Sequence, residues 1–224
     1  MAAQPVIVVM SSLALKGLLE GHKAAFEHSL GARLELRFDA TQAILAKLKS
    51  GAQADLLILT AEAMLTVDVK QVRDLGSSGV GVAVRAGAPK PDIGTVEALK
   101  RSLSAASSVA HSKVGASGIY FAELLQRLEI KLKKRVVVEK GPVGLVVASG
   151  EAEIGVQQLC ELAPVHGIDI VGPLPPPLQK LTYFSAGVAA QAKNPQAALG
   201  LIALLTSDAG RAAMLAGGMQ PADD

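Results

Sequence analysis

The sequence is poor in cysteine, in aromatic residues and in long apolar segments. Cys160 is the single cysteine among 224 residues, so the chain forms no internal disulfide and no metal site built from several thiolates. Tryptophan is absent and aromatic residues make up 3% of the chain. Stacking platforms for unpaired bases are therefore scarce, which argues against a nucleic-acid partner. No apolar run reaches the roughly 18 residues of a membrane-spanning helix.

Metal and cofactor motifs are also lacking. The 4 histidines are scattered and show no metal-ligand spacing. Neither a glycine-rich phosphate loop nor a G-x-S-x-G nucleophile motif occurs. We therefore predict no metal and no cofactor. The formal charge of +2 is nearly balanced, and the short basic run 131–135 is typical of a solvated surface.

Apolar residues make up 50% of the chain and are mostly Ala, Val and Leu. They alternate between short β-branched runs, as at 6–10, 34–38 and 56–59, and amphipathic helical patterns. Alternating buried strands and helices are typical of parallel sheets covered on both faces. The predicted fold class is therefore α/β, with helices on both faces of each sheet.

Two segments look like passages between halves of the molecule. Residues 76–79 read Gly-Ser-Ser-Gly, and residues 172–177 form a proline-rich extended segment before the chain returns as a strand. We predict a discontinuous domain I, residues 1–79 plus 182–224. The inserted domain II would be residues 80–181, with a cleft between the domains.

Hydroxyl residues stand at three predicted strand-to-helix or loop-to-helix junctions: Ser12, Thr41 and Ser117. The free N–H groups and the positive dipole end of a helix N-terminus attract anions. A hydroxyl there is ordinarily a helix cap, but it also adds a donor. Ligands of open α/β sheets bind beyond the carboxyl ends of strands. We therefore predict that these three residues converge on one small oxyanion.

Four motifs carry a family resemblance across nearly the whole chain. They are Met10-Ser11-Ser12-Leu13, the block from Phe38-Asp39-Ala40-Thr41-Gln42 to Gly51-Ala52-Gln53-Ala54-Asp55, Ser117-Gly118-Ile119-Tyr120, and Gly150-Glu151-Ala152-Glu153-Ile154-Gly155. In this order they resemble the type II periplasmic substrate-binding proteins, and within them the molybdate-binding branch. The resemblance implies a two-domain fold that closes on a small anion by a hinge motion.

The resemblance also implies a set of anion contacts. Hydroxyl and backbone donors fall on Ser12 and Thr41, and backbone N–H groups on Ser117, Gly118 and the Pro142-Val143 region. The branch has a binding tyrosine after the strand that 154–156 resembles. Gln157 and Gln158 stand there instead, and the resemblance leaves open which of them faces the ligand.

Two lysines favour a carboxylate over molybdate. Lys16 follows Ser12 by four residues, on the same helix face, and Lys113 lies in the loop before the Ser117 helix. Cations and an amide pair suit a planar, carboxylate-bearing anion. The predicted ligand-binding residues are Ser11, Ser12, Lys16, Thr41, Lys113, Ser117, Gly118, Val143, Gln157 and Gln158.

The main functional hypothesis is a solute-binding protein for a small carboxylate. It would be a monomer that serves an ABC-type transporter or a sensor, and a mature periplasmic form is favoured over a cytoplasmic one. The first alternative is a carboxylate isomerase, since an aconitate isomerase resembles the same branch; Lys113 or His111 would then be the base. A true molybdate or tungstate binder is the second alternative. The absence of a helix-turn-helix segment weakens a third, a sensing module of a transcription factor.

Overall fold

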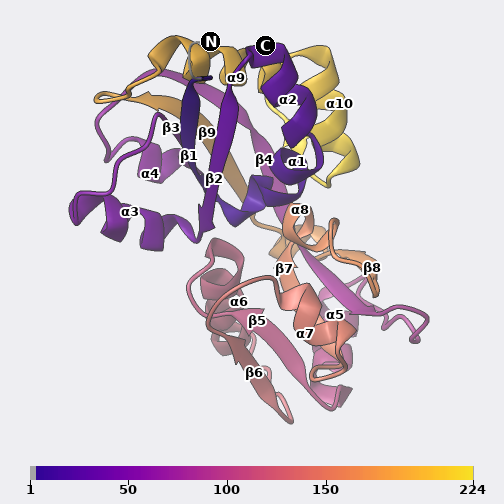
Figure 1. Ribbon diagram of the computed structural model, residues 1–224. Coiled ribbons are helices and arrows are strands. Elements are labelled where there is room, and N and C mark those ends of the chain that lie inside the picture. The colour runs from indigo at the N-terminus through magenta and orange to yellow at the C-terminus, as the bar shows by residue number, and fades with distance from the viewer. Residues whose placement is uncertain (1–3, 224) are drawn as a thin grey trace. The chain divides into compact units, whose positions relative to one another are not determined.

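The computed structural model describes residues 4–223, which divide into two compact units (Figure 1). Unit 1 contains the chain up to Ser77 and again from Tyr183, and unit 2 contains Ser78–Thr182. Each unit has a sheet with helices packed on it. The predicted α/β fold class is therefore confirmed, whereas a hinge movement between domains stays a prediction.

The sheet of unit 1 is built around three parallel strands. β1 (Val6–Ser12) lies between β2 (Arg33–Asp39) and β3 (Leu56–Thr60) and is parallel to both. The sheet continues through β9 (Leu181–Ala189), antiparallel to β3, to the first part of β4 (Val69–Arg85).

Helices and a short strand complete unit 1. Figure 1 shows α3 (Thr41–Lys49) and α4 (Ala61–Met64) on one side of the sheet. Their side chains pack on Met10, Leu57 and Leu59 in one apolar cluster. The remaining elements of unit 1 are η1 (Leu13–Leu15), α1 (Lys16–Gly21), α2 (Lys23–Leu30), α9 (Pro195–Thr206), α10 (Asp208–Ala216) and the short strand β10 (Gln220–Pro221), which pairs with β4.

The sheet of unit 2 repeats the parallel arrangement. β5 (Val109–Ser112) lies between β6 (Arg135–Val138) and β7 (Ile154–Gln158) and is parallel to both. The second part of β4 pairs antiparallel with β7 and with β8 (Ile168–Pro173). Parallel pairs thus form one side of this sheet, and antiparallel pairs attach the long strand β4 and β8 to it.

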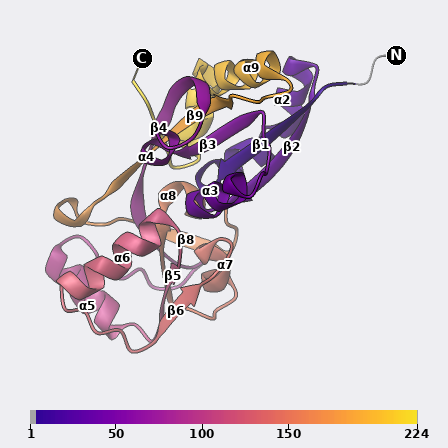
Figure 2. The ribbon, with the colours of Figure 1, turned by 90° about the vertical axis from the view of Figure 1, so that its left-hand side faces the viewer.

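Helices cover both faces of the unit 2 sheet (Figure 2). α5 (Val96–Ala105) and α6 (Ala116–Arg127) share an aliphatic core with β4, β5 and β7 that includes Phe121 and Leu124. α7 (Val143–Ala148) packs on the opposite side, where Val143 contacts Ala110 and Val138. The short helices α8 (Leu159–Leu162) and η2 (Pro176–Leu178) complete the unit.

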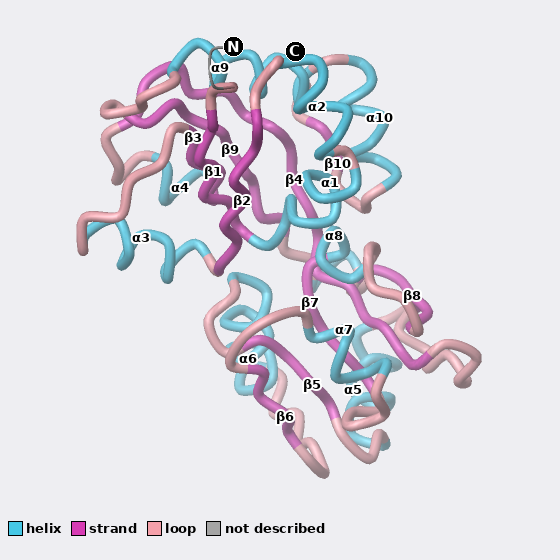
Figure 3. Tube along the Cα trace, viewed as in Figure 1, coloured by secondary structure: helices cyan, strands magenta, loops and turns pink. Residues whose placement is uncertain are grey.

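Residues 76–79, the predicted passage between the halves, lie inside β4, as the continuous strand in Figure 3 shows. The boundary between the two units falls at Ser77 and Ser78, within this strand. The glycines are there for close packing: a Cβ on Gly76 would lie 2.3 Å from the carbonyl oxygen of Gln220. The helical segment after η1 is divided in two, because α1 ends at Gly21, a poor helix former, and α2 begins at Lys23.

No single helix of the described residues is long and apolar enough to cross a membrane; α9 and α10 pass that test only jointly, as a pair bent by 63°. The apolar residues of α9 have a packing role instead. Ala198, Leu201, Ile202 and Leu205 are buried in the core of unit 1.

Asp55 connects three segments of unit 1. It is 3% exposed, and its carboxylate accepts from the Val8 amide at 2.8 Å and from the Lys193 and Asn194 amides at 2.7 and 2.8 Å. This joins β1, the start of β3 and the entry to α9. The Asp that ends the motif block 51–55 therefore has a structural role in this chain.

We expect Asp55→Ala to destabilise the protein by about 3–5 kcal/mol, because three buried N–H groups lose a charged acceptor. Thermal unfolding should show a midpoint lower by roughly 10 °C. The exposed Asp68→Ala is the matched control and should change the midpoint little. Equal midpoints for the two variants would contradict the structural role of Asp55.

Candidate functional site

The predicted unit 1 residues lie at one edge of its sheet. β1, β2 and β3 run parallel, so their carboxyl ends meet there, with Ser12 opposite Asp39 and Ser11 opposite Ile58. Thr41 opens α3 directly beyond β2, and its hydroxyl oxygen accepts from the Thr60 amide at 3.4 Å. Ser12 and Thr41 therefore belong to the same edge.

Ser12 is the residue of this edge whose polar atom is unsatisfied. It is 4% exposed, and its hydroxyl has no hydrogen-bond partner among the described residues. The neighbouring Ser11 hydroxyl donates to the Ser12 carbonyl at 2.9 Å. Buried polar groups without partners are rare and destabilising. A bound anion would supply the missing acceptor.

The N-terminus of α3 adds donors beside Ser12. The first N–H groups of a helix have no partner within it. Ala40 precedes α3 and cannot cap these groups with a side chain, and Asp39 instead accepts from the Ala40 amide at 2.9 Å. The edge of unit 1 therefore combines an unsatisfied hydroxyl with an uncapped helix start, both neutral donors.

Lys16 is engaged within unit 1. Its ammonium group pairs with the Glu20 carboxylate one turn along the helix and lies 5.2 Å from the centre of the Phe38 ring. Phe38 is near the end of β2, so the cation lies close to the Ser12 edge while its charge is partly balanced by Glu20.

The predicted unit 2 residues gather at the corresponding edge of the second sheet. β5, β6 and β7 are parallel, and their carboxyl ends lead to α6, α7 and α8 respectively. Ser117 lies in the first turn of α6 and is 2% exposed. Gly118 follows it, where a Cβ would lie 1.9 Å from the Ser112 carbonyl oxygen. Only glycine allows α6 to begin this close to the end of β5.

Lys113 and His111 have partners inside unit 2. The Lys113 ammonium group lies 3.0 Å from Glu139, and both side chains are exposed. The His111 ring is buried, with Nδ1 2.8 Å from the Ser112 carbonyl and Nε2 2.6 Å from Nε of Arg135. Burial is the main cause that lowers the pKa of His111. Both ring nitrogens are occupied, so this neutral histidine has a structural role.

Gln157 links β7 to α7 and α8. Its side-chain oxygen accepts from the Val143 amide at 2.7 Å, and its side-chain nitrogen donates to the Glu161 carboxylate. Gln157 is 1% exposed and Val143 is fully buried. The polar atoms that the sequence assigned to the ligand, the Val143 N–H and the Gln157 amide, thus bind each other.

Gln158 holds the two strands that enter and leave unit 2. Its amide nitrogen donates to the carbonyl oxygens of Ser78 at 2.8 Å and Gly79 at 3.1 Å, and its oxygen accepts from the Thr182 hydroxyl at 2.7 Å. The side chain is 1% exposed. Gln158 therefore fixes the ends of the unit 2 segment.

Glu161 is a residue that the sequence analysis missed. It lies in the first turn of α8, is partly buried and receives the Gln157 hydrogen bond. Burial raises the pKa of its carboxyl to about 7, although the Gln157 hydrogen bond acts in the opposite direction. A charged residue two positions after Leu159, in an otherwise apolar short helix, was the signal that could have marked it.

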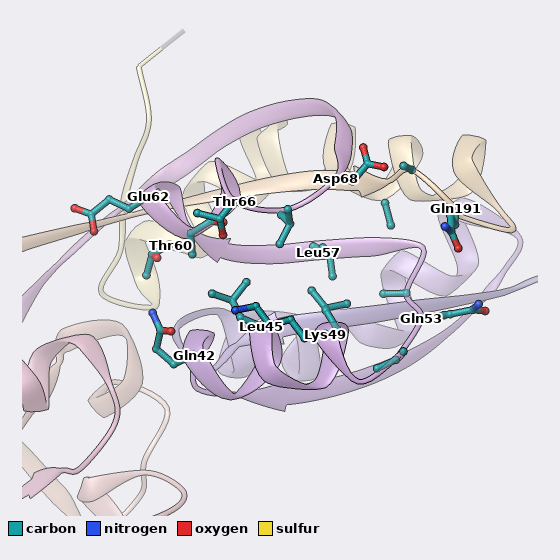
Figure 4. A pocket seen from close by; sticks show the side chains of 18 residues that line it. Gln42, Leu45, Lys49, Gln53, Leu57, Thr60, Glu62, Thr66, Asp68 and Gln191 are labelled. Atoms are coloured by element: carbon teal, nitrogen blue, oxygen red, sulfur yellow. The ribbon is translucent and has the colours of Figure 1, made fainter.

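Unit 1 also contains a cavity that the sequence did not predict. It has a volume of about 880 Å³ and lies between α3 and the segment after α4. Figure 4 shows Leu45 and Leu57 pointing into it, with Gln42 and Thr60 at one end and Gln53 and Gln191 at the other. Its lining is mixed, without a cluster of charges of one sign. Within residues 4–223 no group of three or more His, Cys, Asp or Glu side chains is placed to hold a metal ion.

We expect Ser12→Ala to leave the stability of the ligand-free protein unchanged or raise it by about 1 kcal/mol, because an unsatisfied buried hydroxyl is removed. The matched Ser11→Ala variant loses a buried hydrogen bond and should be about 1 kcal/mol less stable. Urea unfolding of both variants measures the difference. A Ser12→Ala variant less stable than Ser11→Ala would contradict the unsatisfied state of Ser12.

The raised pKa of Glu161 makes its contribution to stability depend on pH. The folded state binds the proton more tightly than the unfolded chain, whose pKa is near 4.5, so stability falls as pH rises from about 4.5 to about 7. We expect Glu161→Gln to remove this loss and to stabilise the protein at pH 8 by on the order of 2 kcal/mol. At pH 4 the variant and the wild type should unfold at similar temperatures. A variant that is destabilised at pH 8 would contradict the burial effect.

Comparisons with known proteins identify the family of this chain. Residues 7–220 match the family model of the bacterial extracellular solute-binding proteins. An aconitate isomerase from Pseudomonas sp is 37% identical over 238 residues, covering 99% of this chain and 90% of the relative.

Solved structures share the fold at low identity. The periplasmic molybdate-binding protein of Azotobacter vinelandii matches with a TM-score of 0.76 at 15% identity, over 97% of this chain and 100% of the other. A periplasmic thiamin binding protein matches with a TM-score of 0.72 at 16% identity, over 100% of this chain and 85% of the other. Proteins with this fold are thus named for unlike ligands, and the fold alone does not identify the ligand. The match over nearly its full length shows that the chain belongs to the bacterial extracellular solute-binding protein family.

Proposed function

We propose that this protein binds a small organic carboxylate with the donors at the carboxyl edge of the unit 1 sheet. The observation that carries the proposal is the buried Ser12 hydroxyl, which has no partner among residues 4–223. The α3 N-terminus at the same edge supplies further donors. Thr41 adds a hydroxyl whose oxygen already accepts from Thr60 N–H, so its O–H proton is available to donate.

Charge and similarity support the carboxylate class. Lys16 lies near the Ser12 edge and raises the local potential for an anion, even though Glu20 balances part of its charge. The relative at 37% identity is named for aconitate, a tricarboxylate. Tyrosine is missing from the end of β7, where Gln157 and Gln158 are held by internal hydrogen bonds. These three arguments favour a carboxylate over molybdate.

Gln157, Gln158, Val143 and Lys113 have a positioning role in this proposal. Their polar groups are used within unit 2, by Glu161, the strand ends and Glu139. Among them, Gln157 joins β7 to the start of α7 and to α8. We further propose a periplasmic location and delivery of the ligand to an ABC-type transporter, as the family membership suggests.

A second candidate function is isomerisation of the bound carboxylate, which the similarity to an aconitate isomerase favours. Interconversion of cis- and trans-aconitate needs one proton to leave the methylene carbon and one to reach the former alkene carbon, while the double bond shifts between them. No electrons are exchanged with a cofactor. His111 is poorly suited as the base because both of its ring nitrogens are occupied.

Isothermal titration with trans-aconitate, cis-aconitate, citrate, molybdate, tungstate and sulfate tests the binding proposal. We expect carboxylate binding that weakens tenfold to a hundredfold in Ser12→Ala, because a hydrogen bond to a charged ligand contributes about 1.5–3 kcal/mol. Ser11→Ala, whose hydroxyl is already bonded to the Ser12 carbonyl, is the control and should bind normally. Submicromolar molybdate binding without carboxylate binding would refute the proposal.

Incubation of trans-aconitate with catalytic amounts of the protein separates the two candidate functions. A receptor binds the anion and leaves it unchanged, whereas an isomerase produces cis-aconitate in many-fold excess over the protein. Chromatography of the products measures this directly. Loss of product in Ser12→Ala, with product retained in Ser11→Ala, would tie the turnover to the proposed site.

A further inference from the structure

The cavity of unit 1 begins at the same sheet edge as the proposed anion contacts. Thr60 is the last residue of β3 and Gln42 lies in the first turn of α3, and both line the cavity. The Thr60 amide also donates to the Thr41 hydroxyl oxygen at 3.4 Å. The end of the cavity that Gln42 and Thr60 form, called the cavity mouth below, therefore lies beside the donors assigned to the ligand.

Ser12 and the cavity lie on the same face of the unit 1 sheet. Side chains along a strand alternate between the two faces of its sheet. Met10, two residues before Ser12, packs with Leu57 in the apolar cluster that α3 covers, and Leu57 also lines the cavity. Ser12 is therefore on the α3 face as well. Its unsatisfied hydroxyl and the first N–H groups of α3 are donors on the face that contains the cavity.

Gln42 is an amide at this edge that has no partner. It is exposed, and its side chain forms no hydrogen bond with the part of the chain that the structure describes. Side chains in a helix lean toward its N-terminus, and Figure 4 shows the Gln42 side chain directed toward Thr60. Gln157 and Gln158, in contrast, are buried and already bonded within unit 2. Gln42 thus keeps both a donor and an acceptor for a ligand at the cavity mouth.

The cavity has room for more than a single oxyanion. Its volume of about 880 Å³ is in the range of small-molecule pockets, roughly 300–1,000 Å³. Leu45 and Leu57 point into it beyond the mouth, and the next amide, Gln53, is at the opposite end (Figure 4). A ligand bound at the edge can therefore place a carbon skeleton against the leucines and a second polar group beside Gln42.

We propose that Gln42 makes the unit 1 site selective for carboxylates that carry a second hydrogen-bonding group. The proposal rests on the proposed function and names its substrate class: polycarboxylates and hydroxycarboxylates, as opposed to simple monocarboxylates. One carboxylate binds the Ser12 hydroxyl and the N–H groups of α3. The second group lies at the cavity mouth, where the Gln42 nitrogen donates to a carboxylate or hydroxyl oxygen and the Gln42 oxygen accepts from a hydroxyl.

Isothermal titration with trans-aconitate tests the role of Gln42. We expect Gln42→Ala to weaken binding about tenfold, because one hydrogen bond to a charged group is lost. Gln53→Ala removes an equally exposed amide at the opposite end of the cavity and is the matched control, which should bind like the wild type. Both variants should unfold at the wild-type temperature, since neither side chain has a partner to lose.

Propionate, which has one carboxylate and no second polar group, separates selectivity from anion binding. Measured by competition with trans-aconitate, it should bind the wild type and Gln42→Ala equally. Ser12→Ala should weaken the binding of both acids, because each places a carboxylate beside that hydroxyl. The ratio of the two affinities should therefore fall about tenfold in Gln42→Ala and stay unchanged in Ser12→Ala.

Two different failures can be told apart. Unchanged trans-aconitate binding in Gln42→Ala, an equal loss for propionate, or a similar loss in Gln53→Ala overturns the role of Gln42 and leaves the proposed function standing. Absence of binding of every carboxylate to the wild type overturns the proposed function, and the role of Gln42 falls with it.

Discussion

Parallel pairing of neighbouring strands is the constraint from which the arrangement of this protein follows. In each unit a central strand, β1 or β5, is parallel to both neighbours, so three carboxyl ends meet at one edge. Each end must turn into a helix to return along the sheet, and each helix begins with free N–H groups. Residues far apart in sequence, such as Ser12 and Thr41, are thereby brought to the same edge.

The polar groups at these edges differ in what satisfies them. In unit 2 the Gln157 amide joins Val143 and Glu161, and the Gln158 amide joins Ser78, Gly79 and Thr182. These buried amides already have hydrogen-bond partners within the protein, so they make the edge rigid and do not need a ligand to satisfy them. In unit 1 the Ser12 hydroxyl is buried without a partner in the described part of the chain. The buried amides at the unit 2 edge are thus hydrogen-bonded, whereas the Ser12 hydroxyl at the unit 1 edge is not.

The sequence predicted the fold because each of its signals is local. Short β-branched runs alternate with amphipathic segments, and the motif block ending at Asp55 follows the family pattern. The strand conformation of residues 76–79 was not predicted, because the reason for glycine lies in a distant neighbour: a Cβ on Gly76 would collide with the Gln220 backbone. A Gly-Ser stretch within a strand has the same composition as a loop, and only the packing partner distinguishes them.

The site was predicted less completely for a related reason. A hydroxyl at a helix start can be read from the sequence, but whether it has a partner depends on the fold. The environment of Glu161 could not be predicted from the sequence either. Its neighbours in sequence, Cys160 and Leu162, indicate only a short apolar helix, whereas its altered acidity arises from burial against α7 and β7. Sequence thus locates donors, and packing decides which of them lack a partner and which carboxyl has a raised pKa.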